Sequence, residues 1–269
     1  MNTLIELLQL PFVQRAVVAG VVLALLTAVL GVLTLIRKAA FYGDAIAHSS
    51  LAGVAIGLWL GWYPLATALL YAVGISMLLP TIRTRLKLPL DNALGIILPA
   101  SMGLGVILFN LLPGFQPEMM SFLFGSMVTI RQSDLVALFL LALISVIFFA
   151  LYLPKLFFLS IDPEYASLLK IPNKWLERAY EMILAATIIA GVKLLGVILV
   201  SALLIVPASA AKLHATSLKS WVILTLIIGQ FVVLGGLAIA MVLNVPPGAT
   251  IAVFSAVVFT ISALIRLVR

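Results

Sequence analysis

The sequence contains no cysteine and very little charge. Without a thiol, the chain has no disulfide bond, no thiolate metal ligand and no cysteine nucleophile. Only 9% of its 269 residues are charged, whereas an ordinary soluble domain has roughly 25%. Any bound metal must therefore be held by oxygen and nitrogen ligands, with methionine sulfur as a weak additional one. Most of the chain is too apolar to face water.

What the sequence does contain is a series of long apolar runs. Hydrophobic residues make up 64% of the chain, and the mean hydropathy is +1.30. We therefore predict an all-α, polytopic membrane protein with about eight or nine transmembrane helices. The sixth and seventh runs are short for a bilayer of roughly 30 Å, which fits a partly re-entrant segment. Residues 119–130 are too few to cross and are expected to dip in from the outer side. The expected spans are residues 15–36, 41–60, 64–82, 93–112, 135–153, 180–192, 196–213, 221–243 and 247–267.

The basic residues fix the predicted orientation. When the loop after the first span is placed in the cytoplasm, only Arg15, Arg131 and Lys193 of the 16 basic residues fall outside. This asymmetry explains the net charge of +7 without a nucleic-acid partner. The first ten residues include Glu6 and lack a basic start, which does not fit a cleavable signal peptide.

We expect one transmembrane domain over residues 1–269, with one sizeable cytoplasmic loop at about residues 157–178. Asp162 suits the N-cap of a short helix there, and Pro163 suits its first position. Glu164 favours the positive helix start, and Lys170 suits the last turn. The plain reading is a connecting turn. Docking of a partner is favoured because a simple connection needs only about 2–8 residues.

Asp44 and His48 form the best candidate site. They lie four residues apart in an apolar stretch, so on a helix their Cβ atoms are roughly 6 Å apart on one face. Counted from Lys38 at about 1.5 Å per residue, Asp44 lies roughly 9 Å and His48 roughly 15 Å into the helix. Ionisable groups at membrane depth mark an ion or proton pathway by default. A carboxylate with a neutral imidazole suits divalent cations such as Zn²⁺ or Mn²⁺.

A ridge of small residues runs beside this pair and predicts close helix packing. Its members are Ala45, Ser49, Gly53 and Gly57. The alternative role for the pair is an Asp–His hydrogen bond that only fixes helix packing. Pro207 is expected to kink the seventh span, with a gating role or none.

Two side chains do not complete a zinc shell of about four ligands. Two routes remain open. Water and backbone carbonyls fill the remaining positions, or a second copy of the chain supplies another Asp44 and His48 across a two-fold axis. The second route is a hypothesis, based on the shortage of other acidic residues within the spans.

Four segments, in this order, resemble the permease subunits of bacterial ABC-type zinc and manganese importers. The resemblance extends over nearly the whole chain, and the Gly-Asp-x-x-x-His element is its most specific part. The segments are FYGDAIAHSSLAG (41–53), SFLFGSMVTIRQSDL (121–135), SIDPEYASLLKIP (160–172) and GVILVSALLIVPASAAKL (196–213).

The resemblance implies the metal-importer ABC permease fold, in a homodimer paired with two cytosolic ATPase subunits in the bacterial cytoplasmic (inner) membrane. An extracytoplasmic metal-binding protein would deliver the ion. Asp44 and His48 would be the metal ligands of the pathway, and no cofactor would be permanently bound. Ala47 before His48 is closer to the zinc branch, so zinc is the first choice, manganese the runner-up and iron(II) a further alternative. The residues implied in coupling to the ATPase are Asp162, Pro163, Glu164, Ala166, Leu169 and Lys170.

Other classes fit less well. The sequence has no G-x-x-x-x-G-K-[ST] phosphate loop, so ATP hydrolysis is expected from a partner. An ion-gradient-driven carrier usually has several ionisable groups along its path and needs no docking loop. An intramembrane hydrolase would need a second intramembrane aspartate or H-E-x-x-H, and the chain is not expected to be an enzyme. A permease for cobalamin or an iron chelate would need a wide path without an ion-ligating pair.

Overall fold

The structure is a computed structural model that describes residues 9–113, 130–168 and 173–268. Every regular element within these residues is an α-helix, which confirms the predicted all-α class. The helices are α2 (Pro11–Ile36), α3 (Tyr42–Leu60), α4 (Pro64–Leu86), α5 (Leu90–Asn110), α7 (Gln132–Ile161), α8 (Pro163–Leu168), α9 (Asn173–Leu195), α10 (Val197–Lys212), α11 (Leu218–Leu243) and α12 (Pro247–Val268).

Within the described residues, each of the nine predicted spans coincides with one long helix. By length and apolar composition alone, six of them can cross a membrane, namely α2, α4, α5, α7, α11 and α12. The predicted outer dip at residues 119–130 lies outside the described residues except for Ile130. The chain is therefore a multi-pass membrane protein.

Proline and glycine set several helix ends. Pro11, Pro64 and Pro247 each stand at the start of a helix, where the missing N–H would have no partner in any case. Gly61 ends α3 with φ 69°, and Gly196 separates α9 from α10 with φ 90°. Glycine takes positive φ angles at no steric cost, which lets the chain turn at these points.

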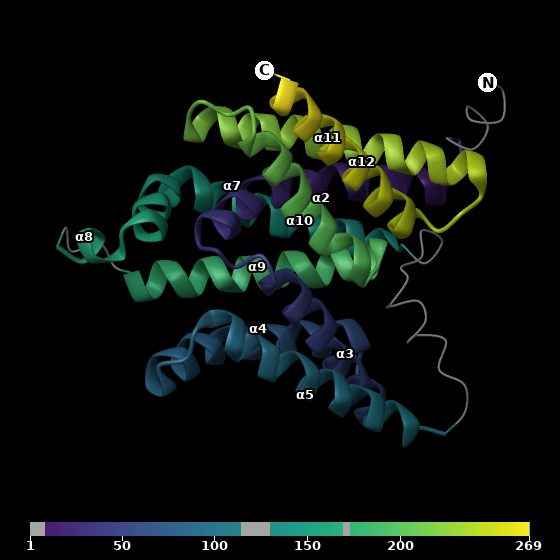
Figure 1. Cartoon of the computed structure of the whole chain (residues 1–269). Helices are drawn as coiled ribbons and strands as arrows, with labels where there is room; N and C mark the ends of the chain where they lie inside the picture. The colour runs from purple at the N-terminus through teal and green to yellow at the C-terminus, as the bar shows by residue number, and fades with distance from the viewer. Residues whose placement is uncertain (1–8, 114–129, 169–172, 269) are drawn as a thin grey trace.

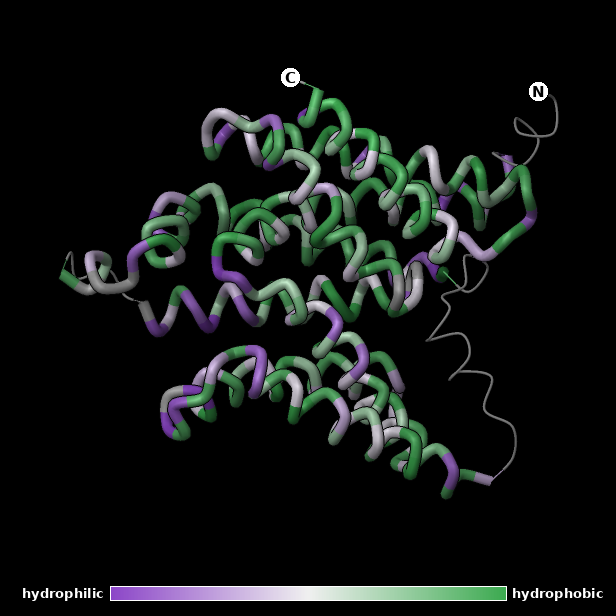
Figure 2. Tube along the Cα trace, viewed as in Figure 1, coloured by the Kyte–Doolittle hydropathy of each residue, from purple (hydrophilic) through white to green (hydrophobic). Residues whose placement is uncertain are grey.

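The helices form two groups joined by α9. Helices α3, α4 and α5 pack mainly on one another, while α2, α10, α11 and α12 form the larger group. Figure 1 shows the first group below α9 and the second above it. Hydrophilic residues gather at the start of α9, on the left of Figure 2, and at the α4–α5 turn.

Small residues allow the larger group to pack closely. A Cβ on Gly31 of α2 would collide with the Leu204 carbonyl of α10. A Cβ on Gly236 of α11 would lie 2.7 Å from the Ile251 Cα atom of α12. Burying apolar surface between helices gains little free energy in lipid, because the lipid tails are equally apolar. Close van der Waals contact of this kind is therefore what holds the helices together.

Two predicted spans end in the wrong places. Helix α7 was expected to end near residue 153, but it continues to Ile161 through Pro154 in its interior. Helix α9 was expected over residues 180–192, but it runs from Asn173 to Leu195. In both places the helix extends beyond the apolar run, because charged residues shift the hydropathy without ending the helix. The predicted loop at residues 157–178 is therefore mostly helical.

Candidate metal site

Helix α3 places Asp44 and His48 on the wall of one cavity. Both side chains are half-buried, and Asp44 lies in the first turn of the helix. The cavity has a volume of about 620 Å³ and lies between α3 and α5. We call it the α3–α5 cavity, and its lining residues are Phe41, Asp44, Ala45, His48, Asp91, Leu94, Gly95, Leu98, Pro99 and Met102.

The two side chains are not bound to each other. In the part of the chain that the structure describes, no hydrogen bond or ion pair joins Asp44 to His48. The carboxylate and the imidazole therefore both face the cavity with capacity to bind a further group.

Two glycines of the small ridge of α3 pack closely against α4. A Cβ on Gly53 would lie 2.7 Å from the Ala68 Cα atom, and one on Gly57 would collide with the Thr67 hydroxyl. Ala45 and Ser49 are also buried. Gly53 and Gly57 thus face α4, whereas Ala45 lies with Asp44 and His48 on the wall of the α3–α5 cavity.

The opposite contact of α3 was missed from the sequence. A Cβ on Gly105 of α5 would lie 2.9 Å from the Ala52 backbone nitrogen, so α5 also packs closely on α3. Asp91, in the first turn of α5, reaches the same cavity as Asp44. Asp91 precedes the predicted span, which begins at residue 93. The signal that would have found it is Pro89, which marks an earlier helix start.

One chain supplies only part of a metal shell. Among the described residues, no group of three or more His, Asp or Glu side chains could hold one ion. Asp44 and His48 would thus give at most two ligands, and Asp91 does not form a three-residue group with them. Oxygen and imidazole nitrogen ligands nevertheless fit a borderline divalent cation.

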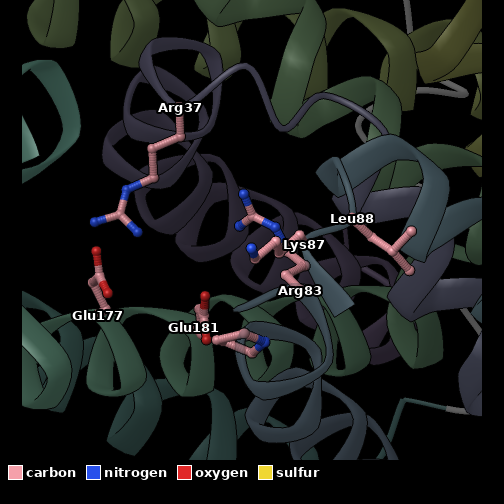
Figure 3. A pocket seen from close by; sticks show the side chains of 7 residues that line it. Arg37, Arg83, Lys87, Leu88, Glu177 and Glu181 are labelled. Carbon is pink, nitrogen blue, oxygen red and sulfur yellow. The ribbon is translucent and has the colours of Figure 1, made fainter. Parts of the chain in front are cut away.

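A second, strongly charged pocket lies between α2, α4 and α9. It has a volume of about 320 Å³, and we call it the charged pocket. Figure 3 shows Glu177 and Glu181 rising from α9 on one side, with basic side chains on the other. Its charged lining residues are Arg37, Arg83, Lys87, Glu177 and Glu181.

The charges in this pocket are incompletely paired. Arg37 donates from Nε to the Ser160 hydroxyl at 2.8 Å and lies over the Tyr180 ring. Arg37 Nη2, Arg83 Nε and Glu181 Oε2 are buried without a hydrogen-bond partner. No direct ion pair joins the five charged side chains among the described residues. Buried charges of this kind are costly unless they are paired.

Charged residues gather again at the other end of the helices. Lys193 donates to the Asp134 carboxylate at 2.5 Å and to the Tyr63 hydroxyl at 2.8 Å. Arg15 donates to the Ile130 carbonyl oxygen at 2.7 Å. Arg15 and Arg37 stand at opposite ends of α2, roughly 33 Å apart along the helix axis. The basic residues predicted outside thus lie far from those of the charged pocket.

The short helix α8 begins as predicted. The Tyr165 backbone N–H donates to Asp162 Oδ1 at 2.9 Å, so Asp162 caps the helix that Pro163 starts. Ala166 is fully buried, which anchors α8 to the rest of the molecule. Leu169 and Lys170 lie outside the described residues. Of Pro163 and Glu164, only the backbone is described.

Pro207 belongs to α10, and His214 follows the end of that helix. Pro207 lies inside α10, and its Cβ atom is 3.9 Å from where a Cβ on Gly229 of α11 would stand. A gating role for Pro207 remains a prediction.

His214 bonds through Nε2 to the Ser262 hydroxyl at 2.8 Å. This contact ties the end of α10 to α12, so His214 serves helix packing.

Comparison with known proteins supports the same class over nearly the whole chain. The family model of the ABC 3 transport family matches residues 9–266. The high-affinity zinc uptake system membrane protein ZnuB of Haemophilus influenzae is 29% identical over 93% of this chain and 96% of its own length. The manganese transport system membrane protein MntC of Listeria monocytogenes is 27% identical, covering 96% of this chain and 92% of its own.

A solved structure shows the same fold. PsaBC from Streptococcus pneumoniae, in complex with Fab, superposes with a TM-score of 0.85. The match has 26% sequence identity and covers 96% of this chain and 94% of that one. The sequence match and the shared fold together establish that this chain belongs to the ABC 3 transport family, as a membrane permease of the ABC transporter class rather than an enzyme.

Proposed function

We propose that the chain is the permease subunit of an ABC importer and moves a divalent transition metal through the α3–α5 cavity. Zinc is the first choice, manganese the alternative and iron(II) a further one. One observation carries the proposal. Asp44 and His48 line a cavity of about 620 Å³ and are not hydrogen-bonded to each other. A pair that only fixed helix packing would be joined and enclosed.

The incomplete ligand shell favours a second copy of the chain. Asp44 and His48 give two of the roughly four ligands that zinc takes. The α5 side chains Ile96 and Ile107 are 61% exposed, so this helix offers an apolar surface to lipid or to a partner. In the homodimer that we propose, the partner's copies of the pair complete the shell across a two-fold axis.

Energy and delivery come from other subunits in this proposal. The sequence has no phosphate-binding loop of its own. Cytosolic ABC ATPase subunits would dock on α8, whose capped start and buried Ala166 give them a firm surface. An extracytoplasmic metal-binding protein would supply the ion at the opposite end, where Lys193 and Asp134 lie. The assembly would sit in the bacterial cytoplasmic membrane.

The choice of metal depends on one small residue. Ala47 stands before His48 and favours the zinc branch, while relatives are named for both zinc and manganese. Ligand chemistry alone does not separate the two ions, because cells also select metals by availability and delivery.

Transport by the reconstituted complex tests the proposal. Uptake of Zn²⁺ and Mn²⁺ into proteoliposomes is compared for the wild type, Asp44→Asn and His48→Gln, with ATPase assembly measured alongside. Both variants should assemble normally and lose uptake. The matched control is Ser49→Ala, because Ser49 lies on the same helix, is buried and has an unpartnered hydroxyl. Uptake that survives both site changes would show that the pair is structural.

A carrier driven by an ion gradient is the alternative, and the same vesicles test it. Metal uptake by the permease alone under a pH gradient, without ATPase subunits, would favour the carrier. Uptake that needs both ATP and the ATPase subunits would support the importer.

A further inference from the structure

Asp91 is the third polar side chain on the wall of the α3–α5 cavity. Among the described lining residues, only Asp44, His48 and Asp91 carry a charged or titratable side chain, and the others are apolar or glycine. The role of Asp44 and His48 has been proposed above, whereas Asp91 has none. It lies on α5 rather than α3, and its side chain is exposed.

The register of α3 and α5 gives the position of Asp91 along the cavity. Both helices start at the cytoplasmic end of the predicted topology, and they contact each other where Gly105 meets Ala52. From that contact back to Asp44 is about 12 Å along α3, at about 1.5 Å per residue. From the same contact back to Asp91 is about 21 Å along α5. Asp91 therefore lies roughly 9 Å nearer the cytoplasm than Asp44.

The three groups are thus arranged in series rather than around one point. His48 is the deepest, Asp44 is one helical turn closer to the cytoplasm, and Asp91 stands beyond it at the mouth of the cavity. This order agrees with the absence, among the described residues, of a three-residue metal site. A metal ion that leaves Asp44 toward the cytoplasm meets Asp91 as the next oxygen ligand of the described cavity wall.

The surroundings of Asp91 suit brief binding. Its carboxylate offers the hard oxygen ligand that a divalent cation accepts. Its exposure to solvent lets water replace the carboxylate on the ion. A ligand with these properties accepts an ion and releases it.

We propose that Asp91 is the exit ligand of the pathway, which accepts the metal from Asp44 and His48 and passes it to the cytoplasm. The inference rests on the proposed function, because it takes the cavity to be a metal path. The plain alternative is that Asp91 only stabilises the start of α5, as acidic residues in a first turn commonly do.

The test separates binding from transport in the reconstituted complex. Equilibrium binding of radioactive Zn²⁺ to the purified complex and Zn²⁺ uptake into proteoliposomes are measured for each variant. Asp91→Asn should bind Zn²⁺ like the wild type, which also shows that it is folded, and should transport about 10-fold more slowly. Asp91→Glu should restore much of the rate, because it keeps the carboxylate.

The neighbouring residue provides the matched control. Asn92 is exposed and does not line the cavity. The double variant Asp91→Asn with Asn92→Asp keeps an acidic residue in the first turn of α5 but moves it off the cavity wall. The double variant should remain slow if Asp91 is an exit ligand. Recovery of the wild-type rate would show that only the helix start needed the charge, and would overturn the proposal.

Other outcomes are equally decisive. Wild-type transport by Asp91→Asn would overturn the exit role, and loss of Zn²⁺ binding would place Asp91 in the main binding shell instead. Failure of the proposed function has a different signature. In that case Asp44→Asn would bind and transport Zn²⁺ like the wild type, whatever the Asp91 variants do.

Discussion

Replacing Gly53 with alanine puts a methyl group into the backbone of α4. The new carbon would stand 2.7 Å from both the Ala68 Cα and the Tyr71 Cβ atoms, and 2.9 Å from the Thr67 carbonyl oxygen. Carbon atoms normally approach to about 3.5–4.0 Å. Helix α4 must therefore retreat by about 1 Å, because its backbone cannot rotate away as a long side chain would.

The cost follows from overpacking. Extra carbon in a well-packed site destabilises by about 1–3 kcal/mol. For a chain of this size we expect Tm to fall by about 5 °C. Thermal unfolding of the purified protein in detergent, followed by circular dichroism, measures the change. Metal uptake should fall as well, because α3 carries Asp44 and His48.

Gly74→Ala is the control, because Gly74 lies inside α4 with no neighbouring atom within 4 Å of the added carbon. Alanine is the better helix former by about 1 kcal/mol, so this variant should be neutral or slightly more stable. If Gly53→Ala unfolds at the wild-type temperature while Gly74→Ala behaves as expected, α3 and α4 do not pack as closely at Gly53 as described.

Four further changes test the charged clusters and the short helix. Lys193→Met should lower stability by about 1–3 kcal/mol, since it leaves the mostly buried Asp134 carboxylate without its cation. The double variant with Asp134→Asn should lose no more stability than Lys193→Met alone. Full additivity of the two single losses would contradict the pairing. Glu181→Gln should leave stability unchanged or raise it, because it removes a buried charge whose Oε2 has no partner. Arg37→Met should be destabilising, since it breaks a hydrogen bond and a ring contact, and equal unfolding temperatures for these two variants would refute the contrast. Asp162→Ala should weaken the start of α8 by about 0.5–2 kcal/mol and reduce stimulation of the ATPase subunits, measured as phosphate release.

The sequence predicted the long helices well because hydropathy is a local property. Each apolar run became a helix, and Pro64 and Gly61 marked the turn between two of them. The helix ends were harder to predict. At Pro154 and at the charged start of α9 the apolar run ended while backbone hydrogen bonding continued, which hydropathy does not detect.

The candidate site was only half visible in the sequence. The spacing of Asp44 and His48 defines one face of one helix, so that pair could be named directly. Asp91 joins them only because Gly105 lets α5 approach α3, a contact between residues far apart in the chain. The charged pocket depends likewise on three helices meeting. The orientation rule placed Arg37 and Arg83 at one end but could not show that α9 brings carboxylates to them.

Helix α9 is long enough to serve as a lever. Its residues Asn173–Leu195 extend over about 34 Å, and Lys193 is fastened to Asp134 and Tyr63 at the far end. A tilt of about 5° around that fastening would swing the α8 end by about 3 Å and Glu177 by about 2 Å. A movement of 2 Å is the difference between a hydrogen-bonded ion pair and two separately hydrated charges. A small tilt of α9 about its Lys193 end therefore suffices to pair or unpair the acidic and basic walls of the charged pocket.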